Sequence, residues 1–148
     1  RRRYRRMNEL KQQPFVWPVR VYFEDTDAGG VVYHSRYLNF FERARTEMLR
    51  AMGISQTELK EKHGYIWVVL DISVKFRQAA RLDDELLATA ELIWVKGVRQ
   101  GFRQELTRKS DGVLVAEAEL SAVMLHADSL KPARMPAWIK TELLKHAE

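Results

Sequence analysis

The sequence predicts an α+β fold in which an antiparallel sheet of about five strands wraps around one long helix. Two observations support this prediction. One long segment carries apolar residues at every third or fourth position, as an amphipathic helix does, and several other segments alternate between apolar and polar residues, as strands do. Most of the alternating segments follow one another with short turns between them. A sheet folded around the helix would therefore bury the apolar faces of both.

The first elements along the chain are a strand and the long helix. Residues 15–25 alternate as a strand does, and Pro18 suits the edge of a sheet because proline cannot donate a backbone hydrogen bond. Helical spacing begins at Ser35 or Arg36, and Gly53 is a typical residue just beyond a helix C-terminus. We therefore expect a strand that leads, through a glycine-containing loop, into the long helix.

The remaining elements are a short helix, further strands and a final helix. Ser55 followed by Glu58 predicts a capped helix start, and this helix ends near residues 63–64. The further strands are predicted over residues 65–76, 85–95, 99–109 and 113–125. One face of the first of these strands is predicted to consist of Val68, Leu70, Ile72, Val74 and Phe76. The final helix is expected over about 137–145, anchored by Trp138 and Leu144.

Composition limits the class of protein. With 148 residues, of which 46% are apolar and 30% charged, the chain fits one globular domain. It has no cysteine, which excludes disulfides and thiol catalysis, and its four histidines lack metal-ligand spacing. No apolar stretch reaches the roughly 18 residues of a membrane span, and the basic N-terminus lacks the apolar region of a secretory signal. We therefore expect a cytoplasmic enzyme without a transmembrane segment, a metal or a cofactor.

The net charge of +5 comes from the N-terminus. Residues 1–6 contain five arginines, and without them 20 basic residues (25 − 5) balance 20 acidic ones. A terminal run of like charges is usually solvated. We therefore expect residues 1–13 to be a disordered basic extension and residues 14–148 to form a single domain. Nucleic acid is not an expected partner.

The stretch between residues 24 and 45 has the outline of a reaction centre. Asp25 and Asp27 follow a strand, Gly29 and Gly30 permit a tight turn, and the long helix then begins. A helix start presents unpaired N–H groups and a partial positive charge, and both stabilise developing negative charge. A simpler alternative is that the two aspartates only form Asx turns before the glycines.

The same stretch carries a family resemblance. Residues 22–34 read YFEDTDAGGVVYH, and Tyr37 and the segment 40–47 (FFERARTE) continue the pattern without a gap. In these residues the chain resembles the hotdog-fold acyl-CoA thioesterases, and within them the 4-hydroxybenzoyl-CoA thioesterase-like branch with its Tol-Pal-associated (YbgC-like) members. The resemblance implies the hotdog fold, with the sheet wrapped around the helix, from about Phe15 to the C-terminal helix.

The resemblance also implies an activity and the residues that perform it. An acyl-CoA would be hydrolysed to the free acid and CoA, with Asp27 as nucleophile or general base. The N–H groups of His34 and Tyr33 would polarise the thioester carbonyl, and the His34 side chain would orient water, hold the substrate or tune Asp27. The substrate pocket is predicted to include Gly29, Gly30, Val31, Val32 and Tyr33.

Substrate and partners are expectations from the same resemblance. Short-chain aliphatic or aromatic acyl-CoA is the expected substrate, and acyl-carrier protein is a further candidate partner. The chain is expected to form homodimers or homotetramers and to have a link to the Tol-Pal system. CoA phosphates favour basic side chains. The candidates for this contact are Arg77, Arg81, Lys96, Arg99 and Arg103.

Three alternative interpretations compete with this one. Glu42 is a second candidate carboxylate, because a helix glutamate does the chemistry in some hotdog branches, although an ordinary ion pair along the helix explains it as well. A dehydratase of the same fold is the closest other enzyme, but it would place a helix acid opposite a strand histidine. A non-catalytic acyl-CoA or acyl-carrier-protein binding module is the alternative from another class, and it would not need Asp27.

Overall fold

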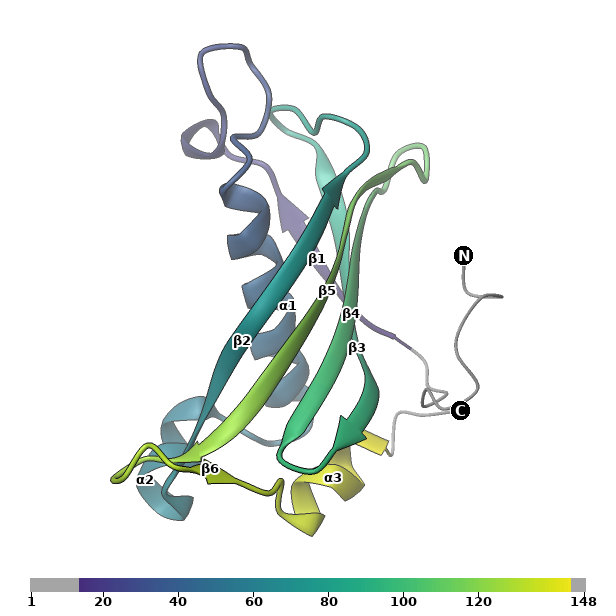
Figure 1. Cartoon of the computed structure of the whole chain (residues 1–148). Coiled ribbons are helices and arrows are strands. Elements are labelled where there is room, and N and C mark those ends of the chain that lie inside the picture. The colour runs from purple at the N-terminus through teal and green to yellow at the C-terminus, as the bar shows by residue number, and fades with distance from the viewer. Residues whose placement is uncertain (1–13, 145–148) are drawn as a thin grey trace.

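The computed structural model describes residues 14–144, in which one antiparallel sheet curves around the long helix (Figure 1). The helices are α1 (Arg36–Ala51), α2 (Gln56–His63) and α3 (Ala137–Leu144), with one 3-10 turn, η2 (Phe23–Asp25). The strands are β1 (Phe15–Arg20), β2 (Tyr65–Phe76), β3 (Glu85–Lys96), β4 (Arg99–Arg108), β5 (Leu114–His126) and the short β6 (Pro132–Ala133). The predicted extension over 1–13 and the predicted helix end at Lys145 lie outside the described residues.

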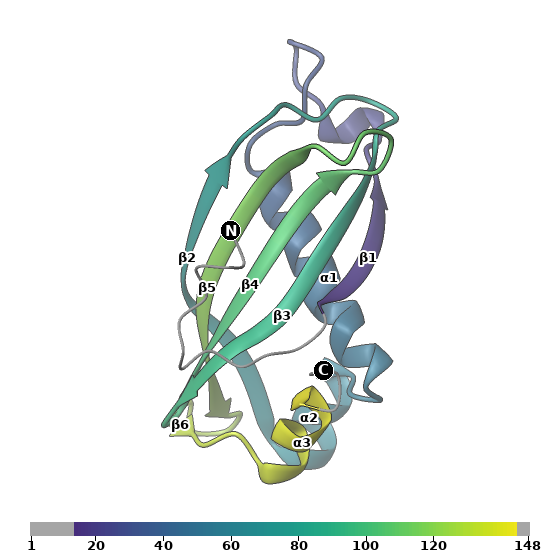
Figure 2. The ribbon, with the colours of Figure 1, turned by 90° about the vertical axis from the view of Figure 1, so that its right-hand side faces the viewer.

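Helix α1 forms the centre of the fold. Its residues Phe40, Phe41, Ala44 and Met48 are buried in the core, and Figure 2 shows the sheet in front with α1 behind it. Burying each large apolar side chain stabilises the fold by about 2 kcal/mol. Gly53 follows the helix with φ +80°, a conformation that favours glycine. The predicted α+β fold around one long helix and the predicted bounds of that helix are confirmed.

Strands β1 and β2 form the two edges of the sheet. The strand order is β1-β3-β4-β5-β2, and β6 pairs with β5. Pro18 pairs with Leu87 of β3 on the edge strand β1, as the sequence predicts. β2 contains 12 residues and pairs with β5 along one side. Within the described part of the chain, the other side of β2 has no strand beside it.

The first strand is shorter than the sequence predicts. β1 ends at Arg20 instead of continuing to Asp25. The Val21 N–H then donates to the Asp84 carbonyl at 2.9 Å, and the chain turns through η2. The carboxylate of Asp25 stabilises this turn, because its Oδ2 accepts a hydrogen bond from the Tyr22 N–H at 2.8 Å. The alternating pattern continues through this turn, which is why the pattern alone placed the end of the strand too late.

The edge strand β2 does not keep one alternation along its length. Its register with β5 shifts between Val69 and Asp71, so the strand contains a β-bulge. Before the bulge Trp67 packs against the core, and after it Ile72 does, whereas Leu70 is exposed. The prediction of one continuous face along this strand is therefore wrong, because the extra residue shifts the alternation to the opposite face.

Helices α2 and α3 lie at the end of the fold away from the start of α1 (Figure 1). α2 begins after Ser55, as predicted. α3 is anchored by Ile139 and Leu143, which are fully buried, whereas Trp138 is 43% exposed and Leu144 is half-buried. The predicted anchors Trp138 and Leu144 are therefore wrong, because Ile139 and Leu143, four residues apart on the neighbouring face of the helix, point into the core instead. No described helix is long and apolar enough to span a membrane.

Candidate active site

The segment between η2 and α1 begins with a tight turn, the glycine loop (residues 27–31). The Asp27 N–H donates to the Val31 carbonyl at 2.9 Å, and the Gly30 N–H donates to the Asp27 carbonyl at 3.0 Å. Gly30 has φ +79°, which a residue with a side chain rarely adopts. Backbone hydrogen bonds and one glycine in the left-handed region therefore define the shape of this loop.

Contacts with the β2–β3 connection hold the glycine loop in place. Thr26 and Val32 form an antiparallel bridge at the base of the loop, and a second bridge joins Val31 to Arg81. The Val32 N–H donates to the Ala80 carbonyl at 2.8 Å, and the Val32 side chain is buried in the core. The loop is therefore attached on one side to the connection between β2 and β3.

An ion pair attaches the same segment to α1. Asp25 is 3% exposed, and its Oδ1 lies 3.1 Å from Nε of Arg36, the first residue of α1. Its other oxygen accepts the hydrogen bond from the Tyr22 N–H. Asp25 thus has a structural role. Its carboxylate forms an ion pair with Arg36 and accepts a hydrogen bond from the turn that precedes it, whereas the simpler alternative expected an Asx turn toward the glycines.

Asp27 is exposed at the start of the glycine loop. Its Oδ1 accepts a hydrogen bond from the Gly29 N–H at 2.8 Å, which is the Asx turn of the simpler alternative. A Cβ at Gly29 would lie 3.2 Å from this oxygen, closer than most such contacts. Among the described residues, no donor bonds to Oδ2 of Asp27. The turn therefore orients the carboxylate and leaves one oxygen for water or a ligand.

The start of α1 presents two unbonded amides. The Tyr33 N–H donates to the Asp25 carbonyl at 2.9 Å, and the Arg36 N–H donates to the Tyr33 carbonyl at 2.9 Å. In the part of the chain that the structure describes, no acceptor bonds to the N–H groups of His34 and Ser35. The Tyr33 amide is thus already occupied, contrary to the expectation that it binds a thioester oxygen. Ser35, which the sequence analysis named only as a possible helix start, has the other unbonded amide beside that of His34.

The His34 ring lies at the surface against the Tyr33 ring, with the ring centroids 4.5 Å apart. Two other histidines lie on different elements: His63 packs against Trp138, and His126 packs against an aromatic ring of β2. Within residues 14–144, no three histidine, aspartate or glutamate side chains gather as a metal site. The polar groups beside the glycine loop are therefore those of an exposed carboxylate, an imidazole and helix-start amides.

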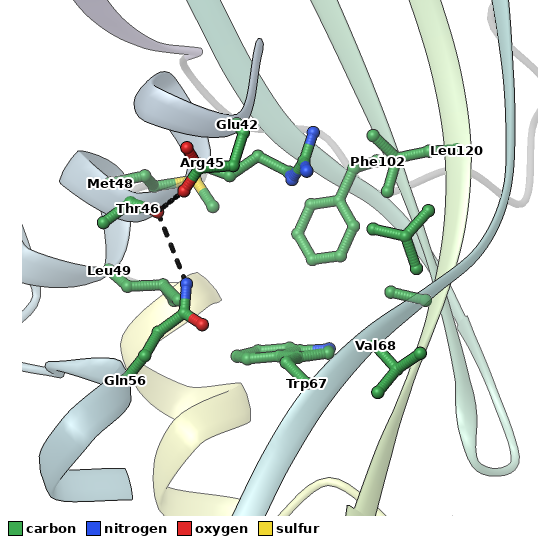
Figure 3. A pocket seen from close by; sticks show the side chains of 12 residues that line it. Glu42, Arg45, Thr46, Met48, Leu49, Gln56, Trp67, Val68, Phe102 and Leu120 are labelled. Carbon is green, nitrogen blue, oxygen red and sulfur yellow. Dashed lines mark hydrogen bonds between the residues drawn. The ribbon is translucent and has the colours of Figure 1, made fainter. Parts of the chain in front are cut away.

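A separate pocket of about 190 Å³ lies between α1 and the β2 side of the sheet (Figure 3). Polar side chains of α1 and α2 face apolar side chains of the sheet across it. Its lining residues include Glu42, Arg45, Thr46, Gln56, Trp67 and Phe102. The predicted pocket residues, Gly29 to Tyr33, do not line it and lie in or beside the glycine loop. Glu42, the alternative catalytic carboxylate, belongs to this pocket instead.

Arg81 is the candidate for CoA binding that lies beside the glycine loop. The bridge between Arg81 and Val31 brings the two segments together. The Arg81 N–H donates to the Asp84 carboxylate at 2.9 Å, and its guanidinium forms no ion pair with any described residue. Arg81 therefore has a free positive charge next to the loop.

The other four CoA candidates differ in position or in pairing. Arg77 and Arg103 each form an ion pair with a glutamate of β5, at 2.8 and 3.1 Å. Lys96 and Arg99 flank the turn between β3 and β4, at the end of the sheet opposite the glycine loop (Figure 1). Within one chain, the structure thus brings Arg81 close to the loop and leaves Lys96 and Arg99 far from it.

Sequence comparison places the chain beside known thioesterases. The family model described as the thioesterase-like superfamily matches residues 21–143. The chain is 43% identical over 126 residues to the acyl-CoA thioesterase YbgC of Haemophilus influenzae, and the alignment covers 85% of this chain and 91% of that protein.

Solved structures agree with this placement. A probable thioesterase from Bartonella henselae superposes with a TM-score of 0.78 at 31% identity, covering 84% of this chain and 100% of that one. Slr0204, a 1,4-dihydroxy-2-naphthoyl-CoA thioesterase from Synechocystis, has a TM-score of 0.82 at 23% identity and covers 88% of this chain and 96% of that one. The second likeness, at its lower identity, bears on the fold alone.

Proposed function

Because this chain belongs to the thioesterase-like superfamily of hotdog-fold proteins and is an acyl-CoA thioesterase, we propose that it hydrolyses its substrate at the glycine loop and the start of α1. Acyl-CoA and water give a carboxylic acid and the CoA thiol. One observation carries the proposal: the exposed carboxylate of Asp27 and the unbonded amides of His34 and Ser35 belong to one segment that an ion pair and two bridges hold in place.

The amides at the start of α1 would stabilise the charge that develops in the reaction. When a nucleophile adds to a thioester carbon, the carbonyl oxygen becomes negative. The His34 N–H, with the Ser35 N–H beside it, would donate to that oxygen, since neither amide is engaged by another acceptor in the described chain. The partial positive charge at the N-terminus of a helix adds to this stabilisation. The exposed His34 ring would contact the substrate from the same turn.

Asp27 would supply either the nucleophile or the base. In the first route, its free oxygen attacks the thioester carbon, the C–S bond breaks, CoA leaves as a thiolate, and water then cleaves the resulting anhydride. In the second route, Asp27 takes a proton from water while the water oxygen attacks the same carbon, and it returns that proton to the departing sulfur. Both routes consume one water and regenerate the carboxylate.

We propose that the active form is a homodimer in which two copies of β2 pair edge to edge. The free side of β2 offers unpaired backbone groups, and Val69, Leu70 and Phe76 on this strand are exposed. The glycine loop is itself exposed in the single chain, so a second copy would shield the thioester from bulk water. A homotetramer, formed from two such dimers, is the larger assembly that the resemblance implies.

Arg81 is the residue that we propose for the CoA phosphates in the same chain as Asp27. Its guanidinium has no carboxylate partner among the described residues, and guanidinium groups bind phosphate through several N–H donors. Arg77 and Arg103 are already paired, and Lys96 and Arg99 would reach a substrate only at the far end of the sheet or on another copy of the chain.

Four finer expectations remain predictions. They are a preference for short-chain or aromatic acyl groups, acyl-carrier protein as a partner, a cytoplasmic location and a link to the Tol-Pal system. Each of them comes from the resemblance. For the acyl preference, the pocket beside α1 favours a chain long enough to reach it, which differs from the short-chain expectation.

The proposed site is tested by single-turnover mass spectrometry with thiol detection. The wild-type protein should release thiol from acyl-CoA esters. An acyl group on Asp27 in quenched samples would support the nucleophilic route, and its absence at full turnover would support the general-base route. An acyl group attached to Glu42 instead would contradict the assignment of the site. Tight binding without thiol release from any ester would favour the binding-module interpretation.

A further inference from the structure

The pocket between α1 and β2 holds polar groups that the proposed hydrolysis does not use. We propose that this pocket binds the far end of the substrate's acyl group and prefers an end that carries a hydroxyl. The inference deepens the proposed function, because it depends on the thioester lying at the start of α1.

One polar side of the pocket is a chain of hydrogen bonds that ends in a carboxylate. The Thr46 hydroxyl donates to Oε2 of Glu42 at 2.5 Å, and the Gln56 amide nitrogen donates to the Thr46 hydroxyl at 3.4 Å (Figure 3). Among the described residues, no donor bonds to Oε1 of Glu42. The pocket therefore offers an acceptor to a ligand.

Arg45 supplies a donor on the neighbouring face of the pocket. Its Nη1 donates to Oε1 of Gln104 at 2.9 Å, and Gln104 is fully buried and donates in turn to the Phe41 carbonyl at 2.9 Å. No carboxylate of the described chain lies within ion-pair distance of Arg45. Burial lowers the pKa of the half-buried guanidinium, and the charge of Glu42 partly offsets this effect. A cation held in this way has further N–H donors for an acceptor in the pocket.

This combination selects the chemical class of the ligand. The pocket contains one negative group, Glu42, and one positive group, Arg45, so its net charge is zero. A carboxylate at the end of the acyl chain would be attracted by Arg45 but repelled by Glu42, and an ammonium the reverse, so the pocket gives an ionised end no net electrostatic gain to offset its loss of hydration. A purely apolar end would displace water from both charges without replacing its hydrogen bonds. A hydroxyl can donate a hydrogen bond to the Glu42 carboxylate and accept one from the Arg45 guanidinium.

The opposite wall of the pocket suits the carbon skeleton of such a group. Trp67 and Phe102 meet there edge to face, with their ring centroids 6.1 Å apart. The Trp67 indole N–H donates to Oε1 of the fully buried Gln100 at 2.9 Å, which fixes the orientation of the ring. The wall is therefore rigid and apolar, whereas the polar groups gather on the side of the helices.

Helix geometry connects the pocket to the proposed hydrolysis site. Leu38, Glu42 and Arg45 are spaced by four and three residues, so they follow one flank of α1, and His34 lies two residues before the first residue of this helix. Leu38 is 41% exposed on this flank and offers an apolar surface between loop and pocket. The eight residues from His34 to Glu42 correspond to about 12 Å along a helix axis. An extended acyl chain spans this distance, whereas the shortest acyl groups do not reach the pocket.

The test compares pairs of acyl-CoA esters that differ only in a terminal hydroxyl, from butyryl to dodecanoyl. For the wild type, we expect kcat/KM of the hydroxylated ester to exceed that of its partner about tenfold, once the chain is long enough to reach Glu42. Glu42→Leu should bring this ratio close to one or invert it. Arg50→Met is the matched control on the same helix, since Arg50 is exposed and bonds to Glu47 outside the pocket, and it should leave the ratio unchanged.

Equal kcat/KM values within every pair for the wild type would overturn the proposal, as would a preference that Glu42→Leu leaves intact. A loss of all turnover in Glu42→Leu would also overturn it, because Glu42 would then take part in the chemistry.

A binding measurement separates this proposal from the proposed function. The free ω-hydroxy acid and its unsubstituted partner are titrated against the wild type, and tryptophan fluorescence reports occupation of the pocket, with Trp67→Phe as the control for the signal. Tighter binding of the hydroxy acid, with a change that Trp67→Phe removes, supports the pocket assignment even if no ester is hydrolysed. Equal affinity for the two acids would contradict it.

Discussion

The carboxylate of Asp25 and the guanidinium of Arg36 lie 3.1 Å apart and join the turn after β1 to the first residue of α1. Between them in the sequence lie the glycine loop and the His34 amide. The ion pair thus closes the segment that carries the proposed reaction, while Asp27, two residues after Asp25, remains exposed. Two aspartates of one motif have different environments, and this difference separates the structural role from the chemical one.

Removal of Asp25 should destabilise the protein. Asp25→Ala would leave the Arg36 guanidinium without its buried partner and the Tyr22 N–H without its acceptor. We expect a loss of about 2 kcal/mol in the free energy of unfolding, less than for a fully buried pair because Arg36 is partly exposed. Glu24→Ala is the control, since Glu24 lies 3.7 Å from the same arginine at the surface, and it should cost less than about 0.5 kcal/mol. Urea denaturation measures both, and equal losses would contradict this account.

The two glycines of the loop should respond differently to alanine. At Gly29, the added Cβ would lie 3.2 Å from Oδ1 of Asp27, so Gly29→Ala should shift the carboxylate and lower kcat about tenfold with a small effect on stability. At Gly30, the φ of +79° is strained for alanine, and Gly30→Ala should cost about 1 kcal/mol of stability. Thermal melts and steady-state kinetics on the same preparations separate the two effects. An unchanged kcat in Gly29→Ala would argue against a reactive role of this carboxylate.

Tyr37 should make stability depend on alkaline pH. Its hydroxyl accepts a hydrogen bond from the Ala80 N–H at 3.2 Å, so Tyr37→Phe should cost about 1 kcal/mol near neutral pH. Burial raises the pKa of Tyr37 above the ordinary 10.0. The folded state therefore keeps a proton that the unfolded state loses, and the contribution of Tyr37 to stability declines as the pH rises above about 10. Unfolding curves across this range should show the difference between wild type and variant shrinking; a constant difference would contradict the prediction.

Arg81 and Arg77 provide a matched test of CoA binding. Arg81 has a free guanidinium beside the glycine loop, whereas Arg77 is paired with Glu117. Arg81→Ala should raise KM for acyl-CoA about tenfold with little change in kcat, because it removes a contact to the non-reacting part of the substrate. Arg77→Ala should change KM much less. If the two variants behave alike, or if Arg77→Ala has the larger effect, the assignment of Arg81 is wrong.

Much of the fold could be predicted because its signals are local. The helical spacing after Arg36, the stop at Gly53 and the alternation in the strands are all read from neighbouring residues. The exceptions depend on tertiary contacts. The apolar–polar alternation continues through Phe23, although the hydrogen bond of Asp25 stabilises a turn there. The bulge near Leu70 reverses the alternation of β2, and no residue type in this strand indicates the bulge in advance.

The candidate site could be predicted in part for the same reason. Asp27, the glycines and the helix start are adjacent in sequence, so their combination can be recognised from the sequence alone. The occupied Tyr33 amide is not visible, because its acceptor becomes known only when the loop is closed. The pocket beside α1 is not visible either, because its groups come from helices and sheet that are far apart in sequence: Glu42 of α1, for example, lines it together with Phe102 of β4. The position of Arg81 is a further example, because only the bridge to Val31 reveals that this residue lies beside the glycine loop.

Thiol release by wild type and Asp27→Asn, measured side by side on the same acyl-CoA, tests the central claim most directly. The amide keeps the shape of the carboxylate and can still accept the Gly29 hydrogen bond, but it can neither attack the thioester nor take a proton from water. We expect kcat to fall by about a hundredfold to ten-thousandfold while KM and the thermal stability stay close to those of the wild type. Wild-type turnover in Asp27→Asn would contradict the account and would bring Glu42 or His34 forward as the reacting group.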